Sequence, residues 1–161
     1  MVIRCIGIDP GLTGAAALVS GIALAVFDLP TVVSGSGTVK RELDAAGLAR
    51  LLASWSYGDE PVKVLLERTS AMPGQGVASM FSMGVSRGII LGVLGALGIP
   101  FSEVTPATWK RYYKLIGADK DRSRTLAIQQ FPTVAAQLAR VSDHNRAEAV
   151  LIAAYCAHLQ R

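Results

Sequence analysis

Two apolar segments, far apart in the sequence, each end on an acidic residue. The first is VIRCIGID, which ends on Asp9 and is followed at once by Pro10-Gly11. The second is VKVLLE, which ends on Glu67. Short apolar runs of this kind predict buried strands. If the two strands run in the same direction within one sheet, both carboxylates lie at the same edge of that sheet.

A third acidic group lies in the segment DHNRAEAV near the end of the chain. Asp143 stands where a helix is expected to begin, and His144 and Glu148 are four residues apart, so they share one face of that helix. Glu148 is flanked by Ala147, Ala149 and Val150 on a helix that we expect to be largely buried, where an unpaired carboxylate is costly.

Carboxylates that are brought together repel one another, and a divalent cation removes this cost. Mg²⁺ prefers hard oxygen ligands, and two such ions about 3.5–4 Å apart can activate water and stabilise the leaving oxygen of a phosphodiester. Each acid also has a structural alternative: Asp9 could start a turn, Glu67 could simply end a strand, and Asp143 could cap a helix. Taken together, the acids favour a metal site.

The net charge of +4 is distributed unevenly along the chain. Residues 1–100 hold seven basic and seven acidic side chains, whereas residues 101–161 hold nine basic and five acidic ones. The basic cluster with its interleaved aromatic residues comprises Trp109, Lys110, Arg111, Tyr112, Tyr113, Lys114, Lys120, Arg122 and Arg124. A basic face with aromatic side chains suits nucleic acid, and the alternative is a solvated amphipathic helix.

Composition points to one soluble domain over residues 1–161 with a substantial core, since 51% of the residues are hydrophobic. We read no targeting segment, and the apolar stretch 88–101 is too short to span a bilayer, so no membrane partner is expected. Cys5 and Cys156 lie in apolar runs and fit reduced core thiols of a cytoplasmic protein, in a bacterial or phage-infected cell.

Hydrophobic periodicity predicts five strands and several helices. The expected strands are residues 2–9, 14–20, 22–28, 62–67 and 99–104. A first helix is expected to start near residue 43 and a long second helix to span about residues 77–97. Two basic helices, separated near Gly117, should follow the Thr105-Pro106 cap, and the last helix should begin at Ser142 or Asp143. The result is an α/β fold with a mixed sheet between helices. Gly84, Gly88, Gly92 and Ala96 form a smooth stripe on the long helix. We expect this stripe to pack against the domain's own sheet or helix, with a second subunit as the alternative.

Three segments resemble the RuvC-type Holliday junction resolvases, especially the phage-like branch. They are IGIDPGLTGAAAL, the long run VLLERTSAMPGQGVASMFSMGVSRGIILGVLGALGIPFSEVTPATWKRYYKL, and DHNRAEAVLIAAY. The resemblance implies a ribonuclease H-like fold with a five-stranded mixed sheet flanked by helices on both faces. It also implies a homodimer that nicks paired strands of four-way junctions or related branched DNA, using two Mg²⁺ or Mn²⁺ ions in each active site.

Position by position, the resemblance implies that Asp9, Glu67 and Glu148 are metal ligands. The bacterial members place an acid or a histidine three residues before the helix carboxylate, where this chain has Asn145, so we expect Asp143 as the fourth ligand and His144 as its competitor. Lys110 and Lys120 match basic residues near the scissile phosphate, and we count Lys120 among the catalytic residues. The expected DNA-binding residues are Lys110, Arg111, Lys114, Lys120, Arg122 and Arg124. Ser70 stands where members often carry an aromatic wedge, so the expected junction-opening residues are Met72, Gln75 and Phe81.

Two other functions use similar residues. Sugar kinases and actin-like ATPases open with a strand, an acid and a phosphate-binding hairpin, but they need two such lobes, and 161 residues is short for them. A ribonuclease H-like module could also bind branched DNA without cutting it. The retained carboxylates argue against a pure binder, because acids near phosphates weaken binding.

Overall fold

The computed structural model describes residues 2–34, 41–71 and 73–161. Its centre is a five-stranded sheet in the order β3-β2-β1-β6-β7. The strands are β1 (Arg4–Asp9), β2 (Ala15–Ser20), β3 (Ala23–Asp28), β6 (Val62–Glu67) and β7 (Phe101–Val104). β1 is antiparallel to β2 and parallel to β6, and β7 is parallel to β6. The predicted mixed sheet is confirmed.

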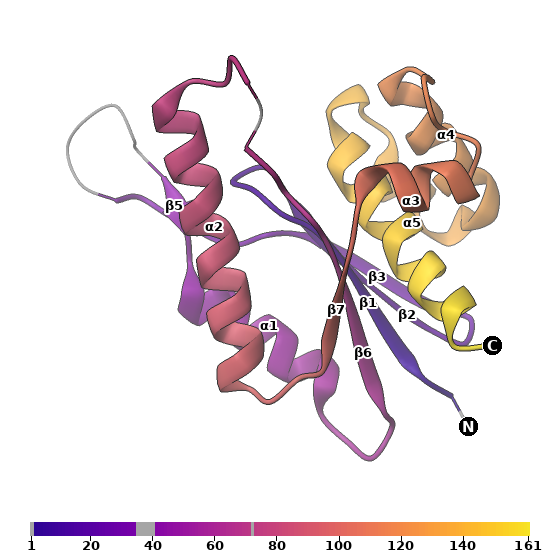
Figure 1. The fold of residues 1–161 in the computed structure, drawn as a ribbon. Helices are drawn as coiled ribbons and strands as arrows, with labels where there is room; N and C mark the ends of the chain where they lie inside the picture. Colours follow the sequence, from indigo (N-terminus) through magenta and orange to yellow (C-terminus); the bar gives the residue numbers. More distant parts are fainter. Residues whose placement is uncertain (1, 35–40, 72) are drawn as a thin grey trace.

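Helices cover both faces of this sheet (Figure 1). They are α1 (Ala45–Ser56), α2 (Val77–Ala96), α3 (Pro106–Tyr112), α4 (Lys120–Gln130) and α5 (His144–Leu159). Alternate residues of β1 divide the core: Ile6 and Ile8 pack toward α1 and α2, whereas Cys5 packs toward the side of α3, α4 and α5. This alternation is the period of two that a doubly covered strand requires.

α5 packs unusually close to β1 because β1 carries a glycine where the two elements meet. A Cβ added at Gly7 would lie 2.2 Å from the backbone nitrogen of Ala153 and 2.5 Å from the carbonyl oxygen of Ala149. Only a residue without a side chain fits there. The close approach brings the first turns of α5 beside the end of β1, where Asp9 lies.

The glycine stripe of α2 does not pack against the domain's own elements. Ser86, Ile90 and Leu94 form the buried face of α2, and the glycines are offset from them by two residues, about 200° around the helix. A Cβ added at Gly84, Gly88 or Gly92 would meet no atom of the described residues within 4 Å. The expectation of intramolecular packing is therefore wrong, and the second-subunit alternative stands.

By length and composition alone, α2 is also long and apolar enough to cross a membrane. Its most apolar 18-residue stretch has a mean hydropathy of 1.6, and 22% of that stretch is buried inside the protein. The sequence-based estimate was shorter because it counted only residues 88–101. Length and composition do not by themselves separate such a helix from a helix of a soluble domain. Near its middle, Arg87 forms an ion pair of 2.6 Å with Glu103 of β7.

Four short elements were not predicted. β4 (Thr31–Val32) and β5 (Glu42–Leu43) form a two-stranded ribbon where we expected a loop and the start of a helix. The 3₁₀ helices η1 (Pro132–Leu138) and η2 (Val141–Asp143) connect α4 to α5. Such two- to seven-residue elements carry too few apolar positions for a periodic signal.

Candidate functional site

Asp9, Glu67 and Glu148 meet at one edge of the sheet. One oxygen from each carboxylate lies within 4.8 Å of the others, and among the described residues these three form the group that could hold a metal ion. Asp9 ends β1 and Glu67 ends β6, two parallel neighbours, so both carboxylates leave the sheet at the same edge. Glu148, from the second turn of α5, completes the acid cluster.

The turn that follows Asp9 is built by glycines. Gly11 has φ of 119°, a backbone conformation that favours glycine. A Cβ at Gly14 would lie 2.1 Å from the carbonyl oxygen of Asp9, so only glycine permits the chain to fold back so tightly. Asn145 of α5 then fastens this turn, because its side-chain nitrogen donates to the carbonyl oxygen of Thr13 at 2.6 Å.

The acid cluster is electrostatically unfavourable without a cation. Burial raises the pKa of Asp9 well above its ordinary value, and the neighbouring Glu67 and Glu148 raise it further. Burial also raises the pKa of Glu67, with a further contribution from Glu148, while a hydrogen bond from Trp109 opposes the shift. Both carboxyl groups therefore hold their protons more tightly in the folded chain than an exposed acid does.

Lys110 supplies part of the missing positive charge. Its ammonium Nζ lies 3.0 Å from Oε1 of Glu148, and the side chains are 30% and 14% exposed. It also lies 5.1 Å from the centre of the Trp109 ring. Three carboxylates and one ammonium still leave an excess of two negative charges when all are ionised, which favours the binding of divalent cations.

The donor set fits a hard divalent cation. All three ligand groups are carboxylates, which suit Mg²⁺ or Mn²⁺ and not the softer metals that thiolates select. Asp9 and Glu67 stand on strand ends and Glu148 on a buried helix, so their backbones are held by the core. The residues present therefore fit the metal that the sequence predicts.

Asp143 does not join the acid cluster, contrary to the expectation of a fourth ligand. Its carboxylate accepts a hydrogen bond of 2.8 Å from the backbone nitrogen of Arg140 and pairs at 2.8 Å with the guanidinium of the same residue. These contacts hold the pKa of Asp143 below its usual range. The side chain thus closes the turn that precedes α5. His144, the competing candidate, also does not belong to the group of possible metal ligands found among the described residues, which is Asp9, Glu67 and Glu148.

The predicted DNA-binding residues divide into three kinds. Arg111, Lys114 and Arg122 are exposed on and after α3 and on α4. Arg124 pairs with Asp121 at 2.7 Å and donates to the carbonyl oxygen of Leu138 at 3.1 Å, so it also holds η1 against α4. Lys110 lies at the acid cluster, and the side chain of Lys120 is outside the described part of the chain.

The aromatic residues of this basic cluster turn inward more than the sequence predicts. Trp109 is fully buried and Tyr113 packs against the same core, where its hydroxyl donates to the carbonyl oxygen of Leu151 at 3.1 Å. Tyr112 is 47% exposed and packs against Tyr155 and His158. Of these three aromatic residues, Tyr112 is therefore the one that is exposed enough to stack on a nucleic-acid base.

Of the expected junction-opening residues, Phe81 is 73% exposed on the second turn of α2. Gln75 precedes that helix and is half-buried. Met72 lies outside the described residues. Val77, at the start of α2 and 79% exposed, is a neighbouring apolar side chain that sequence reasoning did not select.

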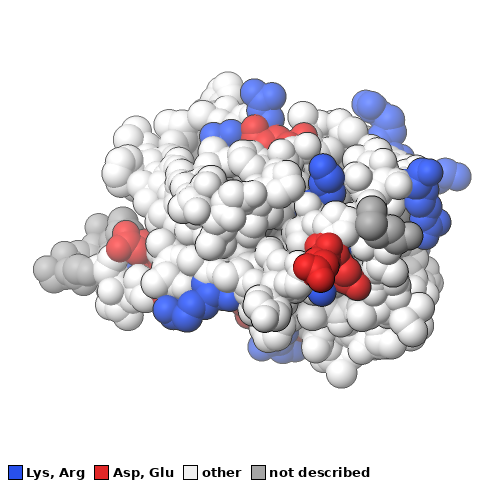
Figure 2. All heavy atoms as spheres, turned by 90° about the horizontal axis from the view of Figure 1, so that it is seen from below, with Lys and Arg blue, Asp and Glu red and all other residues white. Residues whose placement is uncertain are grey.

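The face seen from below in Figure 1, at the starting end of β1, shows mostly uncharged residues with separate small groups of basic and acidic side chains (Figure 2).

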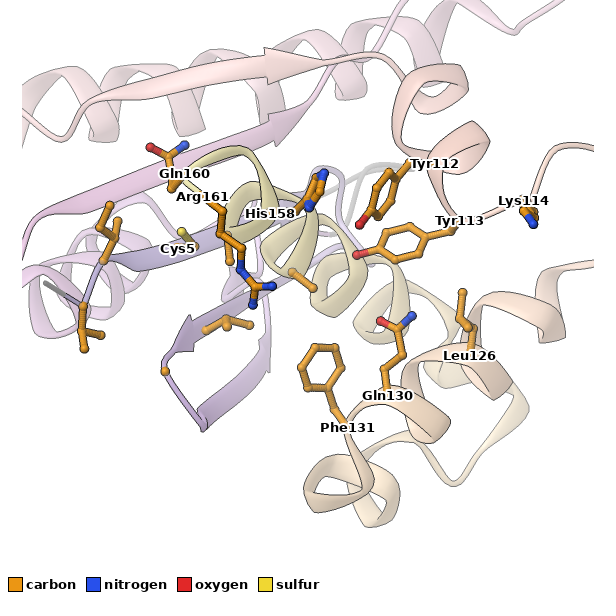
Figure 3. Close-up of a pocket in the computed structure, with 16 residues that line it drawn as sticks. Cys5, Tyr112, Tyr113, Lys114, Leu126, Gln130, Phe131, His158, Gln160 and Arg161 are labelled. Atoms are coloured by element: carbon orange, nitrogen blue, oxygen red, sulfur yellow. The ribbon is translucent and has the colours of Figure 1, made fainter.

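A cavity of about 760 Å³ lies away from the acid cluster (Figure 3). Its wall includes Cys5 of β1, Tyr112 at the end of α3, the following Tyr113, Phe131, and His158 of α5. Neither Asp9 nor the two glutamates line it, so this cavity is separate from the acid cluster.

Sequence reasoning missed two side chains that touch the acid cluster. The indole nitrogen of Trp109 donates to Oε2 of Glu67 at 2.6 Å, and the hydroxyl of Ser123, which is buried, lies 3.5 Å from Oε1 of Glu148. The only available signal was the position of Trp109 beside Lys110 after the Thr105-Pro106 cap. Nothing in the sequence marks Ser123, because its role depends on the packing of α4 on α5.

Comparison with known structures decides the fold. The structure of Thermus thermophilus RuvC matches with a TM-score of 0.54 and 20% identity, covering 99% of this chain and 97% of that one. The same protein in complex with a Holliday junction substrate matches with a TM-score of 0.59 and 17% identity, covering 99% and 96%. The fold is that of RuvC. The ribonuclease H-like architecture predicted from the sequence is thereby confirmed.

A sequence relative of this RuvC-like chain is the chloroplastic Holliday junction resolvase MOC1 of Chlamydomonas reinhardtii. It is 31% identical over 121 residues, which are 74% of this chain but 13% of the length of that protein. No protein-family model matches the chain. The resemblance to Holliday junction resolvases is confirmed by this sequence relative, and the two structures confirm the fold. The assignment to the phage-like branch stays a prediction.

Proposed function

We propose that this chain is a metal-dependent endodeoxyribonuclease that resolves Holliday junctions or related branched DNA by paired nicks. The observation that carries the proposal is the acid cluster of Asp9, Glu67 and Glu148, with Lys110 beside it, at the sheet edge of a RuvC fold. The Thermus thermophilus relative was solved with a Holliday junction, and the Chlamydomonas reinhardtii relative is a Holliday junction resolvase.

In this proposal the three carboxylates hold two Mg²⁺ or Mn²⁺ ions. Bound ions would lower the pKa of a water molecule and offset the negative charge of the phosphodiester during hydrolysis. Asp9, as the most buried of the three acids, would hold its position most firmly. Lys110 would exchange its contact with Glu148 for the scissile phosphate, a position where a cation stabilises developing charge.

The decisive experiment compares a labelled four-way junction with linear duplex of the same sequence, in Mg²⁺, Mn²⁺ or EDTA. We expect symmetric nicks on the junction alone, with both metals and not with EDTA. Junction binding without cleavage under every metal would instead indicate a non-cleaving branched-DNA module. Equal cleavage of the duplex would exclude a structure-selective enzyme.

We infer that the exposed glycine stripe of α2 (Gly84, Gly88 and Gly92) contacts a second copy of the chain. Glycines cost helix stability, roughly 1 kcal/mol each relative to alanine. Within the described part of the chain, no atom packs against their face in return. Contact between two such faces would let the helix backbones approach closely. A homodimer would also supply the two acid clusters that paired nicks require.

Replacing Gly88 by leucine should convert the dimer to a monomer of 16.9 kDa, measured by light scattering. A Cβ at Gly88 meets no atom of the described residues within 4 Å, so we expect the variant to fold while close approach of a second helix is blocked. Ala53→Leu, at an exposed position of α1, is the control and should leave the mass unchanged. A wild-type chain that is monomeric at every concentration would exclude this dimer.

Neutralising Arg111, Lys114 and Arg122 together should make junction binding less salt-dependent. Each lost phosphate contact lowers the slope of log K against log salt by about 0.9, so three contacts lower it by about 2.7. Binding measured between 50 and 200 mM salt, roughly the range where such slopes are resolved, tests this. Neutralising Arg41, Arg50 and Lys63, which are exposed elsewhere, is the control. If the slope is unchanged in the first variant, these three cations face away from DNA.

A further inference from the structure

Trp109 makes an unusual hydrogen bond within the acid cluster. Its indole nitrogen donates to Oε2 of Glu67 at 2.6 Å, and the side chain is fully buried. A buried indole N–H needs an acceptor, and any backbone carbonyl could serve. Here the acceptor is a carboxylate that the proposed function assigns to the metal.

The fold explains why the two groups meet. Glu67 at the end of β6 pairs with Val104 at the end of β7. The next residue, Thr105, caps α3 by accepting a hydrogen bond from the backbone nitrogen of Thr108 at 3.3 Å. α3 therefore starts directly above the end of β6, and its first turn carries Trp109 back over Glu67.

The bond constrains Glu67 in a way that packing alone does not. The indole group is a donor only, so it must occupy an acceptor site of Oε2, while Oε1 stays available to a cation. A ring without the N–H would fill the same core volume but would leave Glu67 free to rotate. The next residue, Lys110, contacts Glu148, so adjacent residues of α3 each hold one of the two glutamates.

We propose that Trp109 is a positioning residue for the metal site, which orients Glu67 through its indole N–H. The inference rests on the proposed metal-dependent function, since it assigns a role within that site. Residues that hydrogen-bond to metal ligands typically change metal affinity about 10–100-fold when they are replaced. Packing alone would make Trp109 a core residue with no effect on metal affinity.

The first test uses the unaltered protein. The chain has two tryptophans, and Trp55 lies in the core on the other face of the sheet, so its indole N–H is an internal control. We expect the Trp109 indole signal in a ¹⁵N–¹H correlation spectrum to shift as Mg²⁺ is added, while the Trp55 signal stays in place. A Trp109 signal that is unmoved at saturating Mg²⁺ would overturn the proposal.

The second test measures Mn²⁺ binding without DNA by calorimetry. Trp109→Phe keeps the ring and removes the N–H, and we expect Mn²⁺ affinity to fall about 10-fold. Tyr113→Phe is the matched control, because it removes another partly buried donor at the C-terminal end of α3. This hydroxyl contacts the Leu151 carbonyl and not the acid cluster. Its Mn²⁺ affinity should stay at the wild-type value.

The two possible failures are distinct. Wild-type Mn²⁺ binding with an unchanged affinity in Trp109→Phe would overturn the role of Trp109 and leave the proposed nuclease intact. A wild-type chain that binds no Mn²⁺ would overturn the metal site itself and this inference with it. Nicking measured against Mg²⁺ concentration should show the same shift, with the half-saturating concentration raised in Trp109→Phe only.

Discussion

We expect Glu148→Gln to lower the rate of metal-dependent nicking of a four-way junction by about 10²–10³-fold or more. Junction binding should stay intact or become tighter. Glutamine keeps the size of the side chain but removes the charge that a divalent cation needs. It also removes repulsion between the acid cluster and DNA phosphates, and it frees Lys110 from its ion pair with Glu148. Nicking and gel-shift assays on the same labelled junction measure the two effects separately.

Asp143→Asn is the matched control for this prediction, because it neutralises a buried acid only five residues earlier in the sequence. Asp143 pairs with Arg140 and lies outside the acid cluster, so this variant should keep nicking activity at the wild-type level when folded. If Asp143→Asn loses cleavage as completely as Glu148→Gln, Asp143 reaches the metal site during the reaction. Full activity of Glu148→Gln would remove Glu148 from the site.

The second large effect concerns stability without metal. The folded chain raises the pKa of Asp9 and Glu67, so above their ordinary values, 3.8 and 4.5, it binds more protons than the unfolded chain. Stability is therefore highest below those values and falls as pH rises toward the folded pKa values. We expect the melting temperature in EDTA to fall as the pH rises above the ordinary values of 3.8 and 4.5, by roughly 2–4 °C for each kcal/mol lost in a chain of this size.

Mg²⁺ should restore most of that loss, because the cation binds the ionised acids of the folded state. Asp9→Asn should flatten the pH dependence and remove much of the stabilisation by Mg²⁺. Calorimetry of both proteins across this pH range, with and without Mg²⁺, gives the comparison. Asp59→Asn, at an exposed acid, is the control and should behave as the wild type. A wild-type melting temperature that is independent of pH in EDTA would contradict the unfavourable charge of the acid cluster.

Much of the fold follows from local patterns. The five strands, the long α2 helix and the Thr105 cap lie within a few residues of their expected places, because apolar periodicity and capping residues act over short distances. The ribbon of β4 and β5 was missed because its strands are two residues long. The start of the first helix was displaced to Ala45 for the same reason, since Leu43 pairs in that ribbon.

The mutual position of distant side chains was harder to predict. The glycine stripe was assigned to internal packing, since sequence spacing shows that glycines share a face but not which face is buried. The aromatic residues of the basic cluster were expected to face nucleic acid, yet Trp109 and Tyr113 pack into the core. Asp143 was placed at the metal, but Arg140, three residues away, holds it in the turn before α5.

The sequence by itself determined that Asp9 and Glu67 end two strands and that Glu148 lies on an apolar helix, because strand and helix periods are local properties. Tertiary structure alone decided which acids meet. Parallel pairing of β1 with β6 aligns the two strand ends, and the missing side chain of Gly7 lets α5 bring Glu148 beside them. It also decided that Trp109 donates to Glu67, since that contact spans 42 residues and depends on α3 starting where β7 ends.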